Sequence, residues 1–163
     1  MVTIRDLMQD DLIFEELTAT DKPGVIREFA RLLTSRGRVT NEHELVRVLA
    51  DRESLGSTGI GGGVAIPHGK LTGITDMVVA FGRSSRGVDF QALDGKPVYL
   101  FFLLLTPQGM AGEHLKTLAR ISRILKNRFL CENLRHASLR QELQRLICEE
   151  DSKYPLPQAV PLK

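Results

Sequence analysis

Hydrophobic positions along the chain recur with two periods, one typical of helices and one of buried strands. In residues 20–36 (TDKPGVIREFARLLTSR), apolar side chains return every three or four positions, which predicts an amphipathic helix ended by Gly37. Thr20 or Asp21 can cap its N-terminus. The same spacing predicts four further helices, over residues 40–52, 111–127, 129–136 and 138–150.

The strand signals are short apolar runs bounded by turn residues. The strongest covers 97–105 and contains the run VYLFFLLL, which is apolar on both faces and therefore predicts a central strand covered on both sides. Weaker signals predict strands over residues 12–17, 64–66, 76–81 and 86–90. Because strands and helices interleave, we expect an α/β fold: a single domain with a mixed central sheet sandwiched between helices.

Helix periodicity also predicts which side chains point inward and where the domain ends. In the 111–127 helix we expect four residues to face the core: Leu115, Leu118, Ile121 and Leu125. Asn41 with Glu44, and Ser138 with Gln141, have the spacing of a capping box. We expect residues 1–150 to form the domain and residues 151–163, which hold three prolines, to be a flexible C-terminal tail.

Charge and composition exclude several classes of protein. The 22 basic and 20 acidic residues leave a net charge of +2, which argues against a dedicated nucleic-acid binder. The apolar run at 98–105 is far shorter than the roughly 20 residues of a membrane span. The acidic start carries no signal-peptide core, and the two cysteines form no CxxC motif. We therefore expect a cytoplasmic protein without a membrane span.

A glycine-rich stretch at 57–70, STGIGGGVAIPHGK, is the most unusual segment of the chain. A phosphate-binding P-loop needs four residues between its glycines and a hydroxyl after its lysine. Here five residues separate Gly63 from Gly69, and Leu71 follows the lysine. A dinucleotide fingerprint fails as well, because Val64 stands where its third glycine belongs. Neither nucleotide motif accounts for the stretch.

His68 ends this stretch, and two other residues accompany it. Arg52 lies at the end of a predicted helix and His114 at the start of another. A neutral imidazole is a competent nucleophile towards phosphorus, and the phosphorylated ring needs positive charge and hydrogen-bond donors. Arg52 offers a planar fork of donors, and His114 stands near a helix N-terminus. We expect the backbone of the flexible segment 61–63 to approach the phosphoryl group closely.

Other interpretations of these residues remain open. His68 can be an ordinary loop histidine, and Arg52 and His114 can be solvated helix ends. A metal site built on the two histidines lacks a third ligand at suitable spacing, and a Ser-His-Asp triad lacks a nucleophile motif. We expect His43 and His136 to lie outside any site.

Three segments resemble one known family. They are RESLGSTGIGGGVAIPHGKL at 52–71, FQALDGKPVYLFFLLLTP at 90–107 and GEHLKTLARISRIL at 112–125. They are similar to the fructose/mannitol-type IIA domains of the bacterial phosphoenolpyruvate-dependent sugar phosphotransferase system, and most to its nitrogen-regulatory branch. The resemblance covers about residues 3–148. It implies a mixed sheet sandwiched by helices, His68 as the phosphorylated residue, and Arg52 and His114 as its supporting residues.

The resemblance also implies partners and two functions. The donor would be an HPr-like phosphocarrier protein docked on a shallow apolar surface, and no metal or other cofactor would be needed. The first function is a regulatory phosphoryl carrier that controls partner proteins by its phosphorylation state. The alternative is a transport component that passes the phosphoryl group to a sugar-specific IIB domain. A third hypothesis is a binding module that is never phosphorylated.

Overall fold

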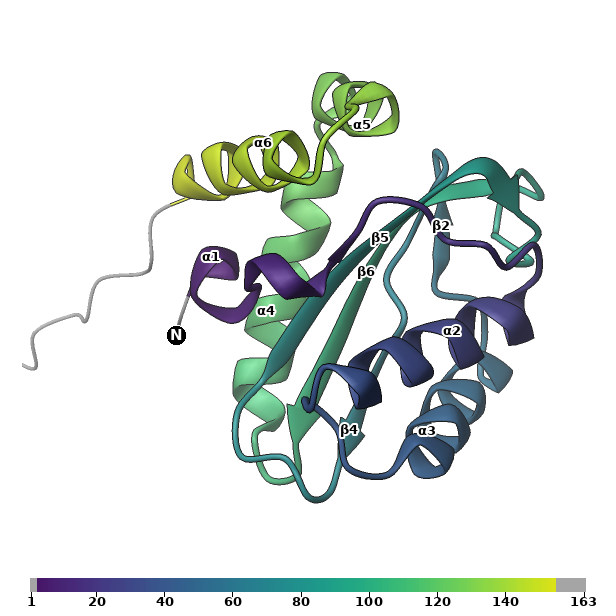
Figure 1. Cartoon of the computed structure of the whole chain (residues 1–163), viewed down its shortest axis with the longest axis vertical. Helices are drawn as coiled ribbons and strands as arrows, with labels where there is room; N and C mark the ends of the chain where they lie inside the picture. Colours follow the sequence, from purple (N-terminus) through teal and green to yellow (C-terminus); the bar gives the residue numbers. More distant parts are fainter. Residues whose placement is uncertain (1–2, 155–163) are drawn as a thin grey trace, which may run out of the picture.

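The computed structural model describes residues 3–154, which form one mixed sheet between two layers of helices (Figure 1). The strands are β1 (Ile13–Phe14), β2 (Gly59–Gly61), β3 (Val64–Ala65), β4 (His68–Leu71), β5 (Val78–Val88) and β6 (Val98–Pro107). The sheet order is β1-β5-β6-β3-β2, and β4 also pairs with β6. The expected α/β architecture is therefore confirmed.

β6 is the centre of the sheet. It runs antiparallel to β5 and parallel to both β3 and β4, which follow one another along its other edge. Pro67 separates β3 from β4 because a proline has no N–H to donate to a ladder. Alternate side chains of β6 enter the two cores, so both faces are buried as its apolar sequence predicts.

Helices α2 (Lys22–Ser35) and α3 (Glu42–Ser54) cover one face of the sheet. Asp21 caps α2 by accepting the N–H of Gly24, and Asn41 caps α3 by accepting the N–H of Glu44. The aromatic side chains of Phe29 and Phe101 pack edge to face between this helical layer and the sheet, with ring centroids 6.3 Å apart.

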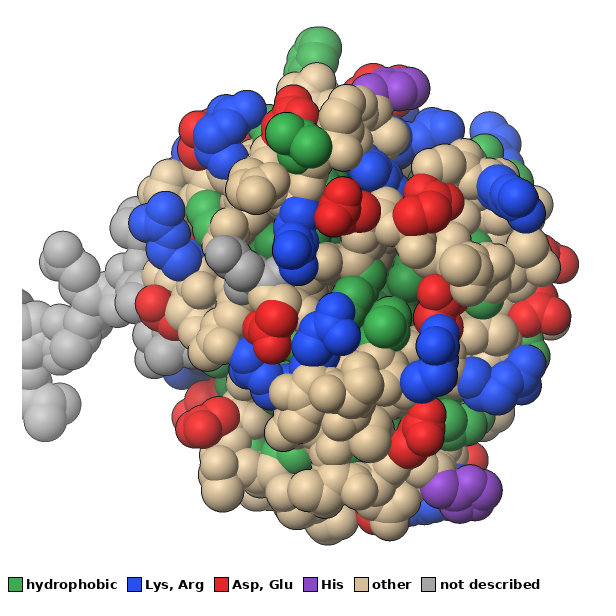
Figure 2. All heavy atoms as spheres, viewed as in Figure 1, with side chains coloured by type: hydrophobic (Ala, Val, Ile, Leu, Met, Phe, Trp, Pro, Cys, Tyr) green, Lys and Arg blue, Asp and Glu red, His purple; other side chains and the backbone are tan. Residues whose placement is uncertain are grey.

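The opposite face is covered by four helices: α1 (Ile4–Leu7), α4 (Ala111–Leu125), α5 (Arg128–His136) and α6 (Arg140–Ser152). Figure 2 shows acidic and basic side chains interspersed over one side of the molecule, in keeping with the small net charge. Among the described residues no helix is long and apolar enough to cross a membrane.

Several expected boundaries were wrong. Residues 12–17 do not form one strand: Asp10–Leu12 is a 3-10 turn, and β1 has two residues. The two strands expected over 76–81 and 86–90 are one continuous strand, β5. Leu115 does not point inward, since its exposed fraction is 67%.

The expectations for the last helix and the tail also need correction. Ser138 does not cap α6, whose N-cap is Leu139 without a side-chain bond. The helix continues to Ser152, so Asp151 belongs to the domain and not to a tail beginning at residue 151. The remainder of the expected tail, residues 155–163, lies outside the described residues.

Asp151 joins the two ends of the domain. Its buried carboxylate accepts the backbone N–H groups of Ile4 (2.9 Å) and Arg5 (3.3 Å) and pairs with Nε of Arg120 at 2.5 Å. Arg120 lies on α4, so this one carboxylate fastens α1, α4 and α6 together. Because both groups are deeply buried, removal of one would leave the charge of the other unpaired inside the protein and would strongly destabilise the fold.

Replacing Asp151 tests this junction. Asp151→Ala should lower the free energy of unfolding by about 3–5 kcal/mol, because the Arg120 charge stays buried without its partner. Urea unfolding followed by circular dichroism measures the loss. Glu149→Ala is the matched control, since Glu149 pairs with Arg145 on the exposed side of the same helix. The control should cost less than about 0.5 kcal/mol, and equal losses in the two variants would contradict the assignment.

Candidate functional site

His68 is the first residue of β4, where it pairs in register with Leu104 of β6. The sequence places this histidine after a strand signal, but β4 itself was not predicted. Parallel pairing with the central strand holds the backbone of His68 in a fixed position, and its side chain is half-buried. A histidine on a strand of the sheet is positioned more rigidly than one on a free loop.

The hydrogen bonds of His68 define its tautomer. Nδ1 lies 2.7 Å from the carbonyl oxygen of Ile66, and a carbonyl oxygen can only accept, so Nδ1 carries the hydrogen. Nε of Arg52 donates to Nε2 of His68 at 3.2 Å, so Nε2 is the acceptor. The ring is therefore a neutral imidazole whose lone pair is on Nε2, the nitrogen that can act as a nucleophile.

Arg52 reaches His68 because α3 packs very closely on β4. A Cβ atom added to Gly69 would lie 2.5 Å from Cγ1 of Val48, closer than two non-bonded carbon atoms can approach. Glycine at this position therefore permits the contact between helix and strand. The Arg52 side chain is also held by the carbonyl oxygen of Gly56, which accepts from one terminal nitrogen at 3.0 Å.

His114 completes the group. It lies in the first turn of α4, is buried, and its ring centroid is 5.4 Å from that of His68. Its Nδ1 lies 2.6 Å from the hydroxyl oxygen of Thr106, the next-to-last residue of β6. All three residues singled out from the sequence are thus brought together, and we refer to Arg52, His68 and His114 as the His68 site.

Both rings of the His68 site have lowered pKa values. Burial lowers the pKa of His68 most, and the Arg52 charge lowers it further, against the raising effects of the Ile66 carbonyl and Glu53. Burial, followed by the positive charges of His68 and Lys70, lowers the pKa of His114 to about 4. At pH 7 the site therefore presents two neutral imidazoles beside a guanidinium group.

The glycines of the 61–63 segment have a different use from the one expected. Gly61, Gly62 and Gly63 all have positive φ, at 98°, 68° and 82°, and form the tight connection between β2 and β3. Gly62 donates its N–H to Asp94 at 3.1 Å. Within residues 3–154, no hydrogen bond links this segment to His68. The expectation that its backbone approaches a phosphoryl group on His68 is therefore not supported.

Two contacts of the site were missed from the sequence. Thr106 and the carbonyl group of Ile66 each orient one of the two rings. A polar residue at the end of an otherwise apolar strand is the signal that could have identified Thr106. No such signal exists for a backbone carbonyl.

Two exposed apolar side chains lie close in the chain to residues of the His68 site. Leu55 follows Arg52 closely in the chain and has an exposed fraction of 83%, and Leu115 adjoins His114. Ile60 and Leu93 are also exposed and lie on neighbouring segments, joined by a hydrogen bond between the Leu93 N–H and the Gly59 carbonyl. No group of three or more metal-ligating side chains is found in the described part of the chain.

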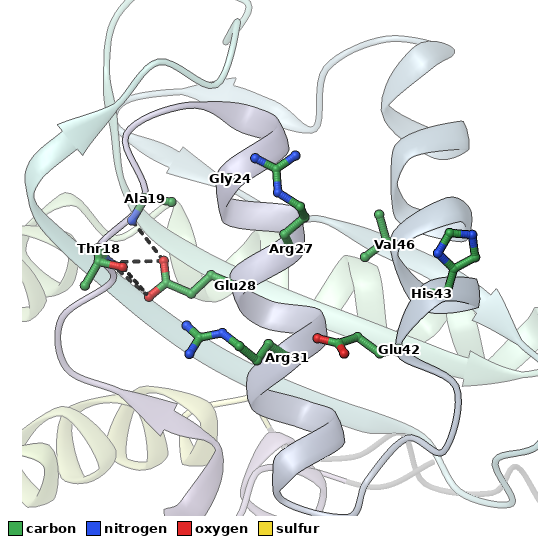
Figure 3. Close-up of a pocket in the computed structure, with 9 residues that line it drawn as sticks. All are labelled: Thr18, Ala19, Gly24, Arg27, Glu28, Arg31, Glu42, His43 and Val46. Atoms are coloured by element: carbon green, nitrogen blue, oxygen red, sulfur yellow. Dashed lines mark hydrogen bonds between the residues drawn. The ribbon is translucent and has the colours of Figure 1, made fainter.

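A separate groove of about 700 Å³ lies between α2 and α3 (Figure 3). Arg27 and Arg31 of α2 and His43 of α3 line it, and it contains no residue of the His68 site. On its wall, the buried carboxylate of Glu28 accepts the backbone N–H groups of Thr18 and Ala19. His136 is exposed on α5 and pairs with Glu132, so neither remaining histidine belongs to the site.

The lowered pKa of His114 predicts a pH-dependent stability. The unfolded chain has the ordinary histidine pKa of about 6.5 and binds a proton more readily than the folded protein. The contribution is therefore complete above pH 6.5 and is lost as the pH falls towards 4. We expect the loss to be on the order of 2 kcal/mol in urea unfolding measured at pH 7 and pH 4.5.

His114→Gln isolates this contribution from the carboxylates that titrate over the same range. The variant should lose clearly less stability than the wild type between the two pH values. The same pH dependence in both proteins would show that His114 titrates normally in the folded state.

Comparison with known proteins places this geometry in a family. Residues 6–150 match the family model described as "Phosphoenolpyruvate-dependent sugar phosphotransferase system, EIIA 2". A nitrogen regulatory protein of Bradyrhizobium diazoefficiens is 41% identical over 133 residues, 81% of this chain and 86% of that protein. A fructose-specific EIIA component of Haloferax volcanii is 35% identical over 139 residues, covering 85% and 90% of the two chains.

The fold agrees with that of a solved relative. The crystal structure of the nitrogen regulatory protein IIA-Ntr from Neisseria meningitidis superposes with a TM-score of 0.83 at 34% identity, over 88% of this chain and 98% of that one. The family resemblance identified from three sequence segments is thereby confirmed. The chain belongs to the EIIA type-2 family of the phosphoenolpyruvate-dependent sugar phosphotransferase system.

Proposed function

We propose that the protein is a regulatory phosphoryl carrier that accepts a phosphoryl group on Nε2 of His68 and controls partner proteins by its phosphorylation state. The donor is an HPr-like phosphocarrier protein, and the exchange takes place in the cytoplasm. Family membership and the nitrogen regulatory relatives support this proposal. The observation that carries it is the neutral ring of His68, with Nδ1 bound to a carbonyl and Nε2 next to Arg52.

The transfer step follows from this geometry. The Nε2 lone pair of His68 attacks phosphorus and forms a new N–P bond while the N–P bond of the donor phosphohistidine breaks. The electron pair of the broken bond returns to the donor ring, and the proton on Nδ1 of His68 stays in its bond to Ile66. The reaction needs positive charge and donors around the transferred group, since negative charge is spread over its equatorial oxygens.

Arg52 and His114 are suited to supply those donors. The Arg52 guanidinium group lies beside Nε2, where it can bind phosphoryl oxygens in place of the ring nitrogen. The hydroxyl of Thr106 can donate to Nδ1 of His114, which leaves the single proton of the neutral ring on Nε2. His114 then offers its Nε2–H group from a ring that lies next to the His68 ring.

The exposed apolar side chains around the site fit the docking of a donor protein. Leu55 and Leu115 flank Arg52 and His114 in the chain, and both are largely exposed. Large apolar side chains exposed next to site residues are candidates for a protein interaction surface. A phosphocarrier seated there would also exclude water from the transferred group.

Phosphoryl transfer from an HPr-like carrier tests the proposed roles. His68→Ala should abolish labelling, because the nucleophile is removed. Arg52→Ala and His114→Ala should each slow labelling by about 10²–10³-fold, the usual cost of removing one oxyanion donor. Intact mass spectrometry with acid treatment measures the label, since phosphohistidine is acid-labile. His43→Ala, on the separate groove, is the control and should be labelled at the wild-type rate; acid-labile label on His68→Ala would assign the carrier role to another residue.

The transport alternative has support of its own. The fructose-specific relative shows that sugar-specific EIIA proteins share this sequence pattern. The same His68 site would serve a IIB domain as acceptor. Loss of label from the phosphorylated protein on addition of a IIB domain and its sugar would favour transport, whereas retention of the label favours regulation.

Partner binding is the test of regulation itself. Phosphorylation adds about −1.5 to −2 charges beside the exposed apolar surface, so a partner should bind the two forms with at least tenfold different affinity. Affinity capture with phosphorylated and unphosphorylated protein, followed by titration calorimetry of each captured protein, measures this difference. His68→Ala should bind as the unphosphorylated form whether or not the donor is present. Equal affinity of every partner for both forms would favour the hypothesis of a binding module.

A further inference from the structure

A chain of hydrogen bonds that includes His68 and Arg52 passes through three residues outside the His68 site, namely Glu53, Thr58 and Ile66. We propose that Glu53 is a positioning residue that holds His68 in its Nδ1–H tautomer by fixing the segment that carries the Ile66 carbonyl. The chain of bonds runs from Glu53 through Thr58, Ile66, His68 and Arg52, and the peptide bond between Arg52 and Glu53 closes it into a ring. We call it the Glu53 ring.

The first link joins Glu53 to Thr58. The Glu53 side chain lies at the C-terminal end of α3 and is buried, with an exposed fraction of 8% for the residue. Its carboxylate accepts the Thr58 N–H at 3.1 Å and the Thr58 hydroxyl at 2.5 Å. Lys22 at the start of α2 pairs with the same carboxylate at 2.9 Å, so its charge is compensated inside the protein.

The second link joins Thr58 to His68. The carbonyl oxygen of Thr58 accepts the N–H of Ile66 at 3.1 Å, and the carbonyl oxygen of Ile66 accepts Nδ1–H of His68 at 2.7 Å. Thr58 therefore supports the Ile66 peptide on the side away from β6, and Glu53 in turn holds Thr58. The only contact that orients Nδ1 of His68 in the described residues is thus two bonds away from the Glu53 carboxylate.

The ring closes through Arg52, whose Nε donates to Nε2 of His68 at 3.2 Å. Arg52 and Glu53 are consecutive residues at the end of α3. The Arg52 side chain contacts Nε2 of His68 directly, whereas the Glu53 side chain is connected to Nδ1 through Thr58 and Ile66. A carboxylate only accepts hydrogen bonds, so both donors of Thr58, its N–H and its hydroxyl, point to Glu53. Loss of this acceptor would leave both donors of Thr58 without their partner and would loosen residue 58, whose carbonyl holds Ile66.

The tautomer decides which nitrogen is nucleophilic. Without the Ile66 carbonyl at Nδ1, the ring can carry its hydrogen on Nε2, and no lone pair then faces Arg52. The expected change in transfer rate rests on the proposed function, whereas the tautomer is a property of the unphosphorylated protein. The two can therefore be tested separately.

The experiment is ¹⁵N NMR of the imidazole of His68 in uniformly labelled protein, together with labelling by the HPr-like carrier. The test variant is Lys22→Met with Glu53→Met, which removes the ion pair as a whole and leaves no buried charge unpaired. We expect the wild type to show one Nδ1–H tautomer. The double variant should show a substantial Nε2–H population and a labelling rate about tenfold lower.

Two variants are the controls. Lys22→Met with Glu53→Gln keeps an acceptor oxygen for Thr58 and also leaves no buried charge unpaired, so it should keep the wild-type tautomer and a rate within about twofold. Glu28→Met removes another buried carboxylate that holds two backbone N–H groups, but it lies on α2 outside the Glu53 ring (Figure 3). It should leave the His68 spectrum and the labelling rate unchanged.

The outcomes separate the possibilities. A folded double variant with the wild-type ¹⁵N spectrum would overturn the proposal, as would an equal change in Glu28→Met. If the double variant does not fold, Thr58→Val decides, because it removes only the hydroxyl bond to Glu53; an unchanged tautomer there would also overturn the proposal. Failure of the wild type to accept label would contradict the proposed function, while the NMR result would still decide the role of Glu53.

Discussion

The close packing of α3 on β4 is the contact on which the His68 site depends. Arg52 and His68 are on different elements, and the guanidinium group reaches the ring only because Gly69 leaves room for Val48 of the helix. β4 in turn is held by β6, whose end carries Thr106, the partner of His114. One strand pairing and one helix contact therefore set the positions of all three functional side chains.

The helices and the central strand could be predicted because their signals are local. Caps at Asp21 and Asn41 and the apolar run of β6 depend only on residues near one another in the chain. The site residues could be identified from the segments around His68 and His114, which carry the resemblance to the family that the comparisons confirm. The local hydrophobic pattern thus predicted the architecture, and the family motifs predicted which residues form the site.

What could not be predicted depends on contacts between distant residues. β4 reads His-Gly-Lys-Leu, which has little strand propensity, and it forms a strand because it pairs with β6. Leu115 has helical spacing but points to solvent, because helix periodicity gives a stripe and not its direction. The tautomer of His68 rests on the Ile66 carbonyl as well as on Arg52, and a backbone group cannot be identified from a sequence.

The bond between Asp151 and Ile4 has a consequence for synthesis of the chain. These residues are 147 positions apart, and α1 has only four residues, too few to be stable as a helix on their own. Helix α1 must therefore wait until residue 151 has been synthesised before it can dock through this bond. Completion of this half of the core follows synthesis of α6, and the apolar residues Ile4 and Met8 lack this part of their packing until then.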